Sequence, residues 1–385
     1  MKVAQIIPCL GKNSGGPSRS VYSLSQGLRE VGVDIVILTQ DYACNTNIVA
    51  EDWIDALPVN KVKPFEYNPE FKKLLKDRIR QGDIQLFHIN SVYSYPTFIA
   101  ASLARKAHLP YIITPRGSLY HDVLEVSSKW KKRLFNSLFL IRQLNHASVV
   151  HVTCSEEMEA IRKLRISSPV AIIPNSITLP NERPVIDSPD LLRICYLGRI
   201  NIKKNIMGLI KAWHNSGLSN DHNAELVIIG AAQLDKEKCY LSNLHKLESD
   251  LAIDNIRWAG SKEGAEKEMI LRSCSFLIMP SFSENFGMVV PEALQYGIPV
   301  VASKGTPWQI LEEKNCGWWV DADVDSLASC LKHLQMVSKE DRYNMGLRGQ
   351  QLVWDHFSTK AVCKMQIELY NWILNGGEKP EFVFL

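Results

Sequence analysis

Short apolar runs recur along the chain, and each is followed by a segment with the periodicity of an amphipathic helix. The runs are VAQIIP, DIVILT, IQLFHI, YIITP and SVVHVT in the first half of the chain and RICYLG, ELVIIG, SFLIMP and IPVVAS in the second half. Almost continuous apolar strands of this length are typical of parallel sheets that helices cover on both faces. The pattern therefore predicts an α/β fold with doubly wound parallel sheets.

A proline-rich stretch interrupts this alternation near the middle of the chain. Residues 171–190 contain Pro174, Pro180, Pro184 and Pro189, which fit neither helix nor strand periodicity. We therefore predict a first Rossmann-like domain over residues 1–175, a linker over residues 176–190 and a second Rossmann-like domain over residues 191–357.

Helical stripes mark the beginning and the end of the chain. The segment after the glycine-rich turn GGPSRS carries an apolar stripe made of Val21, Leu24, Leu28 and Val31. The last segment, over residues 358–385, stops its helical pattern at Gly376 and carries a stripe made of Val362, Met365, Leu369 and Trp372. This C-terminal helix and tail can pack on either domain, and a return to the N-terminal domain is the hypothesis.

Composition and charge narrow the class of protein. With 385 residues and 46% hydrophobic content, the chain is long enough for two domains that each have a core. The net charge of +3 excludes nucleic-acid binding driven by gross charge. The nine cysteines are scattered and form no CxxC pair, unlike a disulfide framework or a zinc site. Since no signal peptide or spanning segment is recognisable either, we expect a cytoplasmic location and no nucleic-acid partner.

The stretch SENFGMVVPE, directly after the run SFLIMP, carries the first candidate chemistry. A strand that turns into a helix leaves backbone N–H groups that attract phosphate, and Gly287 has no side chain to obstruct a ligand there. Glu284 and Glu292 would repel a phosphate, so they are better suited to accept hydrogen bonds from hydroxyl groups. A ligand with phosphates between two sets of hydroxyls is a nucleotide sugar. The alternative is that Glu284 caps a helix and Glu292 is merely solvated.

The stretch GRINIKKN, just past the run RICYLG, supplies two cations. Arg199 offers a planar fork of donors and Lys204 a compact charge, so together they can neutralise a diphosphate as it leaves. No metal is then needed, and the sequence shows no DxD pair well placed to hold one. The alternative is a solvated basic turn.

With these motifs in this order, the chain resembles the retaining glycosyltransferases of family four, which have the GT-B fold of two Rossmann-like domains facing a central cleft. PSFSENFGMVVPEALQYGIPVVAS is similar to the family's two-glutamate signature, and YLGRINIKKN is similar to its G-R-x-x-x-x-K-G element, with Asn205 in place of the final glycine. The resemblance spans nearly the whole chain. PRGSL, GTPW and GWWV resemble the subset that assembles polysaccharides and O-antigens.

The resemblance implies a role for each matching residue. Glu284 would contact the hydroxyls of the donor sugar, and Glu292 would contact those of the ribose. Arg199 and Lys204 would hold the diphosphate and stabilise its departure. The remaining donor-binding residues would be the opposing lip of Gly15 and Gly16 and the amides of Asn285, Phe286, Gly287 and Met288.

One position departs from the pattern of many relatives, which have a histidine where this chain has Arg116. Arg116 can supply positive charge beside the reacting sugar but cannot act as a general base, because it stays protonated. We therefore place Arg116 with the catalytic candidates. His88 and His121 are candidates for the acceptor side, and the alternative for a lone histidine in an apolar run is a structural role.

The segment KWKKRLFNSLFLIRQL suggests contact with a membrane. It groups Lys129, Lys131, Lys132 and Arg133 before an apolar helical stripe of Leu134, Phe135, Leu138 and Ile141. Basic residues beside such a stripe suit the interface of an anionic membrane. The alternative is that the stripe is core and the basic residues are a solvated face.

Together these features predict a retaining, metal-independent glycosyltransferase that needs no cofactor, because the UDP- or GDP-linked sugar is a substrate. Its acceptor would be a glycan, lipid-linked as in polysaccharide or O-antigen biosynthesis, and the enzyme would be cytoplasmic with peripheral contact at the inner face of the membrane. Two alternatives stay open. A GT-B epimerase or phosphorylase would share the sheets, and a catalytically silent subunit would bind nucleotide sugar without turnover.

Overall fold

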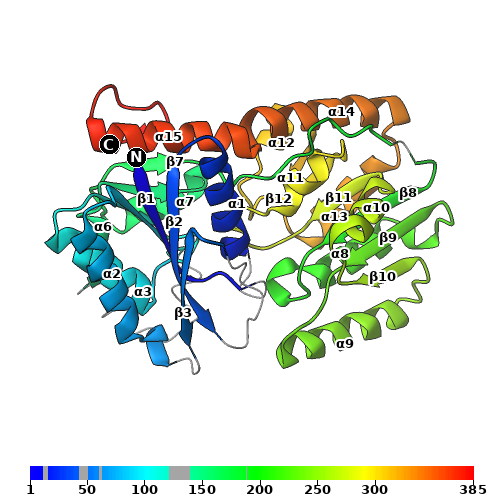
Figure 1. Cartoon of the computed structure of the whole chain (residues 1–385). Coiled ribbons are helices and arrows are strands. Elements are labelled where there is room, and N and C mark those ends of the chain that lie inside the picture. Colours follow the sequence, from blue (N-terminus) through cyan, green and yellow to red (C-terminus); the bar gives the residue numbers. More distant parts are fainter. Residues whose placement is uncertain (12–15, 43–50, 60–62, 121–138, 188) are drawn as a thin grey trace. The chain divides into compact units, whose positions relative to one another are not determined.

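The chain leaves its first structural unit after Thr178 and returns to it at Ser358. In the computed structural model, Met1–Thr178 and Ser358–Leu385 form one unit and Leu179–Phe357 forms the other (Figure 1). The structure describes residues 1–11, 16–42, 51–59, 63–120, 139–187 and 189–385. The predicted linker over residues 176–190 is divided between the two units, because the boundary falls between Thr178 and Leu179.

The first unit is built on an eight-stranded sheet with the order β14-β7-β6-β5-β4-β1-β2-β3. Neighbouring strands are parallel except for β14, which runs antiparallel to β7. The strands are β1 (Lys2–Cys9), β2 (Asp34–Tyr42), β3 (Ile54–Val59), β4 (Leu86–Asn90), β5 (Tyr111–Thr114), β6 (Val149–Val152), β7 (Val170–Ile172) and β14 (Val383–Phe384).

Helices cover both faces of this sheet, as the apolar strands predict. One face packs against α1 (Gly16–Glu30) and α15 (Thr359–Asn375). The other packs against α2 (Pro69–Gln81), α3 (Tyr95–Lys106), α6 (Ile141–Leu144) and α7 (Ser155–Lys163), with a 3-10 turn η2 (Pro64–Glu66) before α2. Side chains of β1 alternate between the two cores, since Val3 belongs to the first and Ala4 to the second. Val31, predicted on the stripe of α1, lies beyond the helix and is 54% exposed.

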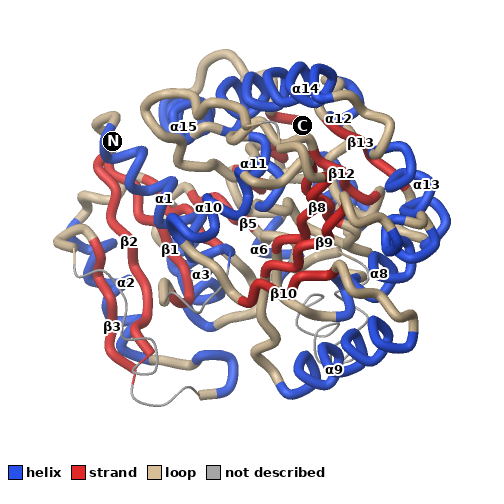
Figure 2. Tube along the Cα trace, turned by 90° about the vertical axis from the view of Figure 1, so that its right-hand side faces the viewer, coloured by secondary structure: helices blue, strands red, loops and turns tan. Residues whose placement is uncertain are grey.

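The second unit contains a six-stranded parallel sheet with the order β10-β9-β8-β11-β12-β13 (Figure 2). Its strands are β8 (Leu192–Leu197), β9 (Ala224–Ile229), β10 (Ile256–Gly260), β11 (Phe276–Met279), β12 (Val300–Ser303) and β13 (Gly317–Val320). Its helices are α8 (Ile206–Asn215), α9 (Asp235–Asp250), α10 (Gly264–Arg272), α11 (Val289–Leu294), α12 (Ile310–Glu313), α13 (Val324–Leu334) and α14 (Lys339–Leu352). Shorter turns are η4 (Ile202–Lys204), η5 (Leu218–Asn220) and the π-turn η6 (Val353–Phe357).

Each sheet reverses its strand order at one point. The reversal falls between β1 and β4 in the first unit and between β8 and β11 in the second. In open α/β sheets, ligands bind outside the carboxyl ends of the strands at such a switch point. The predicted stretches GRINIKKN and SENFG follow β8 and β11, so the fold brings both to the switch point of the second unit.

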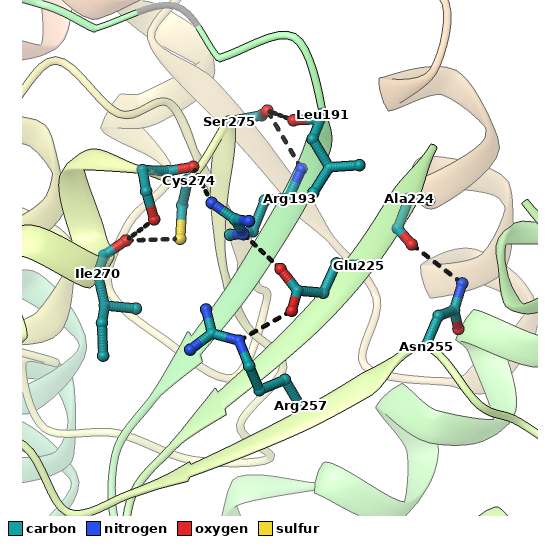
Figure 3. Close-up of polar contacts among 10 residues, drawn as sticks. Leu191, Arg193, Ala224, Glu225, Asn255, Arg257, Ile270, Cys274 and Ser275 are labelled. Atoms are coloured by element: carbon teal, nitrogen blue, oxygen red, sulfur yellow. Dashed lines mark hydrogen bonds and ion pairs between the residues drawn. The ribbon is translucent and has the colours of Figure 1, made fainter. Parts of the chain in front are cut away.

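Charged side chains link neighbouring strands of the second sheet near their amino ends, opposite the switch-point loops (Figure 3). Glu225 on β9 accepts hydrogen bonds from Arg193 on β8 and from Arg257 on β10, the latter at 2.8 Å between Nε and Oε1. Burial alone would raise the pKa of Glu225, but the hydrogen bonds and charges of the two arginines lower it below its usual value. The cluster therefore links three adjacent strands.

The apolar runs predict most of the central strands and miss the edge strands and the short strand β7. Every run quoted above contains an observed strand. The edge strands β3, β10 and β13 were not predicted, because their side chains are only partly buried and their sequences are less continuously apolar. The strands β7 and β14 were not predicted either, since they are only three and two residues long. Among the helices in the described ranges, none is long and apolar enough to cross a bilayer.

Candidate active site

A short turn holds Lys204 at the carboxyl end of β8. Lys204 is the last residue of η4, and Asn205 follows it with φ of 55° in the left-handed region. Asparagine adopts this conformation more readily than most residues, which explains how it replaces the glycine of the family element. The Asn205 side chain also donates to the carbonyl of Ala322 at 2.8 Å, so the turn is tied to the chain after β13.

Lys204 and Glu284 meet at the switch point. The Nζ of Lys204 forms an ion pair with Oε1 of Glu284, and the Ser281 hydroxyl donates to the same oxygen at 3.1 Å. The two charged side chains are only 23% and 15% exposed, so solvent screens the pair incompletely. The backbone N–H of Glu284 donates to the carbonyl of Gly305 at 3.0 Å, which fixes its loop to the one after β12. Two residues predicted from separate motifs thus form one cluster.

Trp308 stabilises the turn after Glu284. Gly287 has φ of 81°, and a Cβ there would lie 2.8 Å from the Met279 sulfur, so a larger residue would be both strained and crowded. The buried indole of Trp308 donates to the carbonyl of Phe286, and the two rings lie 5.2 Å apart between centroids. Phe357 packs against both rings. The flanking residues Asn285 and Met288 are partly exposed on this fixed turn.

Glu292 lies next to a lysine that the sequence did not point to. Its Oε2 is 3.0 Å from the Nζ of Lys267 on α10, and the two side chains are 24% and 27% exposed. Glu292 lies in the first turn of α11, which begins at Val289. Both candidate glutamates are therefore paired with lysines and still partly open to solvent.

Arg199 lies just past β8 with an exposed side chain. Its carbonyl accepts a hydrogen bond from the Tyr196 hydroxyl at 2.8 Å, while its guanidinium bonds to no side chain or backbone group in the described ranges. Burial raises the pKa of Tyr196, the charge of Glu284 raises it further, and that of Arg199 opposes the increase. Arg199 therefore lies near the Lys204–Glu284 pair and can meet an anionic ligand.

Arg116 lies at the carboxyl edge of the first sheet, half-buried and with φ of 52°. Its guanidinium donates to the side-chain oxygens of Asn90 at 2.8 Å, Asn175 at 3.1 Å and Ser20 at 3.2 Å. None of the described carboxylates lies within ion-pair distance. Burial lowers the pKa of Arg116 to about 10, against the opposing charge of Glu157, so the residue keeps its charge at neutral pH.

His88 belongs to the core of the first unit. It is fully buried, with Nδ1 2.8 Å from the hydroxyl of Tyr370 and Nε2 2.8 Å from that of Thr114. Burial lowers the pKa of His88 well below its usual value, with smaller contributions from His151 and Arg116. The structure gives this side chain no exposed surface for an acceptor, and the structural alternative describes it better.

The other candidates in the first unit are less informative. Gly16 is the exposed first residue of α1. Gly15, His121 and the basic cluster Lys129, Lys131, Lys132 and Arg133 lie outside the described residues, as do Leu134, Phe135 and Leu138 of the adjoining stripe. The membrane hypothesis for that segment stays a prediction.

Each unit matches one family profile. The profile described as Glycosyltransferase Family 4 matches residues 14–179, and the profile described as Glycosyl transferases group 1 matches residues 181–350. The chain belongs to the family-four glycosyltransferases. This glycosyltransferase is 24% identical to the alpha-1,3/1,6-mannosyltransferase ALG2 of Kluyveromyces lactis, over 94% of this chain and 83% of that protein. It is 22% identical to a phosphatidyl-myo-inositol mannosyltransferase of Mycolicibacterium smegmatis, over 99% of this chain and 96% of that protein.

Solved structures place the glycosyltransferase in the GT-B fold. A sucrose-phosphate synthase from Thermosynechococcus elongatus aligns with a TM-score of 0.77 and 18% identity, over 98% of this chain and 100% of that chain. HepE from Anabaena, in complex with UDP and glucose, aligns with a TM-score of 0.74 and 16% identity, over 96% of this chain and 99% of that chain. The predicted fold is therefore confirmed.

Sequence motifs missed several contacts of this glycosyltransferase site. Lys267 belongs to no motif, and only the packing of α10 near α11 reveals its contact with Glu292. Trp308 stands in the GTPW stretch, but nothing in that stretch points to the Phe286 carbonyl. Ser281 precedes Glu284 by three residues, and its contact depends on the turn after β11.

Proposed function

We propose that this glycosyltransferase moves a sugar from a UDP- or GDP-linked donor to a glycan acceptor, with retention of anomeric configuration and without a metal or other cofactor. The observation that carries the proposal is the Lys204–Glu284 pair at the switch point of the second sheet, with the exposed Arg199 nearby. Cations beside hydroxyl-accepting carboxylates suit a ligand that carries both phosphates and sugars.

Each group has one task in this proposal. Arg199 and Lys204 stabilise the negative charge that develops on the departing diphosphate, which is the largest contribution expected from the protein. Glu284 accepts hydrogen bonds from the transferred sugar, Glu292 accepts them from the ribose, and the backbone of Asn285 to Met288 lines the sugar and phosphates. Since none of the carboxylates in the described ranges is an obvious nucleophile, the acceptor hydroxyl attacks from the face that the diphosphate leaves.

The acceptor we propose is a lipid-linked glycan in the assembly of cell-surface polysaccharide or O-antigen, on the cytoplasmic face of the membrane. Support comes from the stretches PRGSL, GTPW and GWWV and from the mannosyltransferase names of the two relatives, one of which acts on phosphatidyl-myo-inositol by name. Arg116 is charged, its partners among the described residues are neutral oxygens, and in this proposal it contributes positive charge on the acceptor side.

A panel of UDP- and GDP-sugars tests the proposal. A retaining transferase without its acceptor should slowly release nucleotide and free sugar. NMR should show that the newly formed sugar has the anomeric configuration of the donor. Activity should persist in excess EDTA, because Arg199 and Lys204 take the place of a cation. Inversion at C2 would instead indicate an epimerase, and binding without turnover would indicate a silent subunit.

A further inference from the structure

A groove of about 480 Å³ runs beside the edge strand β13 of the second unit. It lies between this strand and α13, which are neighbours in Figure 2. Its principal lining residues are Lys304, Trp318, Trp319, Asp321, Asp325 and His333. We call it the tryptophan groove. None of the residues to which the proposed donor site is assigned lines it.

The two tryptophans are partly exposed, and their rings are fixed in place. The indole N–H of Trp319 donates to the carbonyl of Thr306 at 2.9 Å. The ring of Trp318 meets those of His333 and Phe276 edge to face, with 5.8 Å between centroids in each case. Rigid aromatic surfaces of this kind offer contact area to an apolar ligand face at little cost in conformational entropy.

Charges at the rim disfavour an anionic ligand. Asp321 and Asp325 are exposed, and the Nζ of Lys304 is already paired with Asp321 at 2.8 Å. A strand-like peptide is disfavoured as well, because the backbone N–H of Trp319 donates to Glu312 at 3.3 Å and this part of the sheet edge is capped. Carboxylates do accept hydrogen bonds from hydroxyls. Aromatic faces with carboxylates at the rim therefore fit a neutral sugar, whose C–H face packs on a ring while its hydroxyls reach the rim.

Backbone contacts connect this groove to the loops of the candidate donor site. The N–H of Lys304 donates to the carbonyl of Val320 at 2.8 Å. The next residue, Gly305, accepts from the N–H of Glu284 at 3.0 Å. The groove therefore begins on the same loop that supports Glu284.

We propose that the tryptophan groove binds neutral sugar residues of a glycan, at a place distinct from the nucleotide-sugar site. The proposal rests on the proposed function in one respect, since the glycan is the one on which the transferase acts. A chain bound along β13 extends away from the donor loop, so the groove would retain a growing glycan between transfers.

A printed array of bacterial and eukaryotic glycans, probed with the full-length labelled protein, tests this inference. Wild type should bind a subset of neutral glycans, and Trp319→Ala should weaken that binding about tenfold or more, as truncation of a central aromatic contact does. Trp319→Phe should retain most of it, because the aromatic face remains. Asp325→Asn, on the exposed first turn of α13, should weaken glycan binding without disturbing the fold. If Trp319→Ala does not fold, this variant tests whether the groove binds glycans.

Lys204→Ala separates the two sites. It should leave array binding unchanged, and Trp319→Ala should leave the affinity for free UDP and GDP unchanged. The inference is overturned if wild type binds no glycan, if both groove variants bind as wild type does, or if Lys204→Ala abolishes array binding. A failure of the proposed function would appear separately, as absence of nucleotide release from every donor of the panel.

Discussion

Lys204 and Glu284 form an ion pair although they are 80 positions apart in the chain. Each follows one of the two strands that flank the switch point of the second sheet. In this pair, each charge is balanced by the other. In the proposed function, a nucleotide sugar would offer phosphates to the lysine and hydroxyls to the glutamate, so binding would exchange one ion pair for two charge-assisted contacts and leave neither charge alone.

We expect Lys204→Ala to lower turnover about a hundredfold or more, because the proposed contact of Lys204 with the departing diphosphate would strengthen as the bond breaks. Release of nucleotide from the active donor measures it, with thermal unfolding as a check on the fold. Lys203→Ala is the matched control, since Lys203 is the exposed neighbour in the same turn. Near-normal turnover by a folded Lys204→Ala protein would refute its assignment.

The two glutamates should affect different steps. Glu284→Gln should depress turnover and leave the affinity for free nucleotide nearly intact, because the proposed function assigns Glu284 to the transferred sugar. Glu292→Gln should weaken free nucleotide and nucleotide sugar alike, by about ten- to a hundredfold for a charge-assisted hydrogen bond. Calorimetric titration of UDP and GDP against both variants distinguishes these roles. If both substitutions change nucleotide affinity equally, the two glutamates do not have different roles.

Trp308→Phe should lower turnover about tenfold, because it keeps a ring beside Phe286 and Phe357 but loses the N–H donor that fixes the turn at Gly287. Trp213→Phe is a matched control, since Trp213 is also fully buried and its indole donates to Asn255 at 2.9 Å. The control should lose comparable thermal stability and keep its turnover. If both variants lose turnover equally, the effect is one of stability and not of the turn.

The cluster of Arg193, Glu225 and Arg257 should make stability depend on acid pH. The pKa of Glu225 is lowered in the folded protein, so its contribution is present above the unfolded pKa of about 4.3 and is lost as pH falls through the folded pKa. Glu225→Gln should lower the unfolding temperature at pH 7, through a loss of roughly 1.5–3 kcal/mol, and this difference from wild type should shrink below about pH 4.

Asp254→Asn serves as the control for that measurement, because Asp254 is an exposed carboxylate of the same unit. Its effect on the unfolding temperature should be small at both pH values. A Glu225→Gln deficit that persists unchanged into acid would mean that packing, and not charge, accounts for the contribution of Glu225.

The hydrophobic pattern was sufficient to predict the strands around each switch point. It was insufficient to predict side-chain partners that only tertiary packing brings together. Runs such as RICYLG and SFLIMP are mostly apolar because helices cover both faces of these central strands, so their composition indicates a central position in the sheet. The sequence around Lys267 gives no comparable indication, since its contact with Glu292 depends on how α10 and α11 pack. His88 shows the converse, because a histidine at a strand end suggested a surface role and the fold buries it beside Tyr370.

The contribution of Ser358–Leu385 to the first unit sets an order of events during synthesis. The second unit is a continuous stretch, Leu179–Phe357, so all of it leaves the ribosome before α15 does. The first unit must wait for that helix, and until it arrives Gln5 and His88 lack the Tyr370 hydroxyl, to which they lie within 2.9 and 2.8 Å in the finished protein. The half of the protein that is translated first is therefore the half that is completed last.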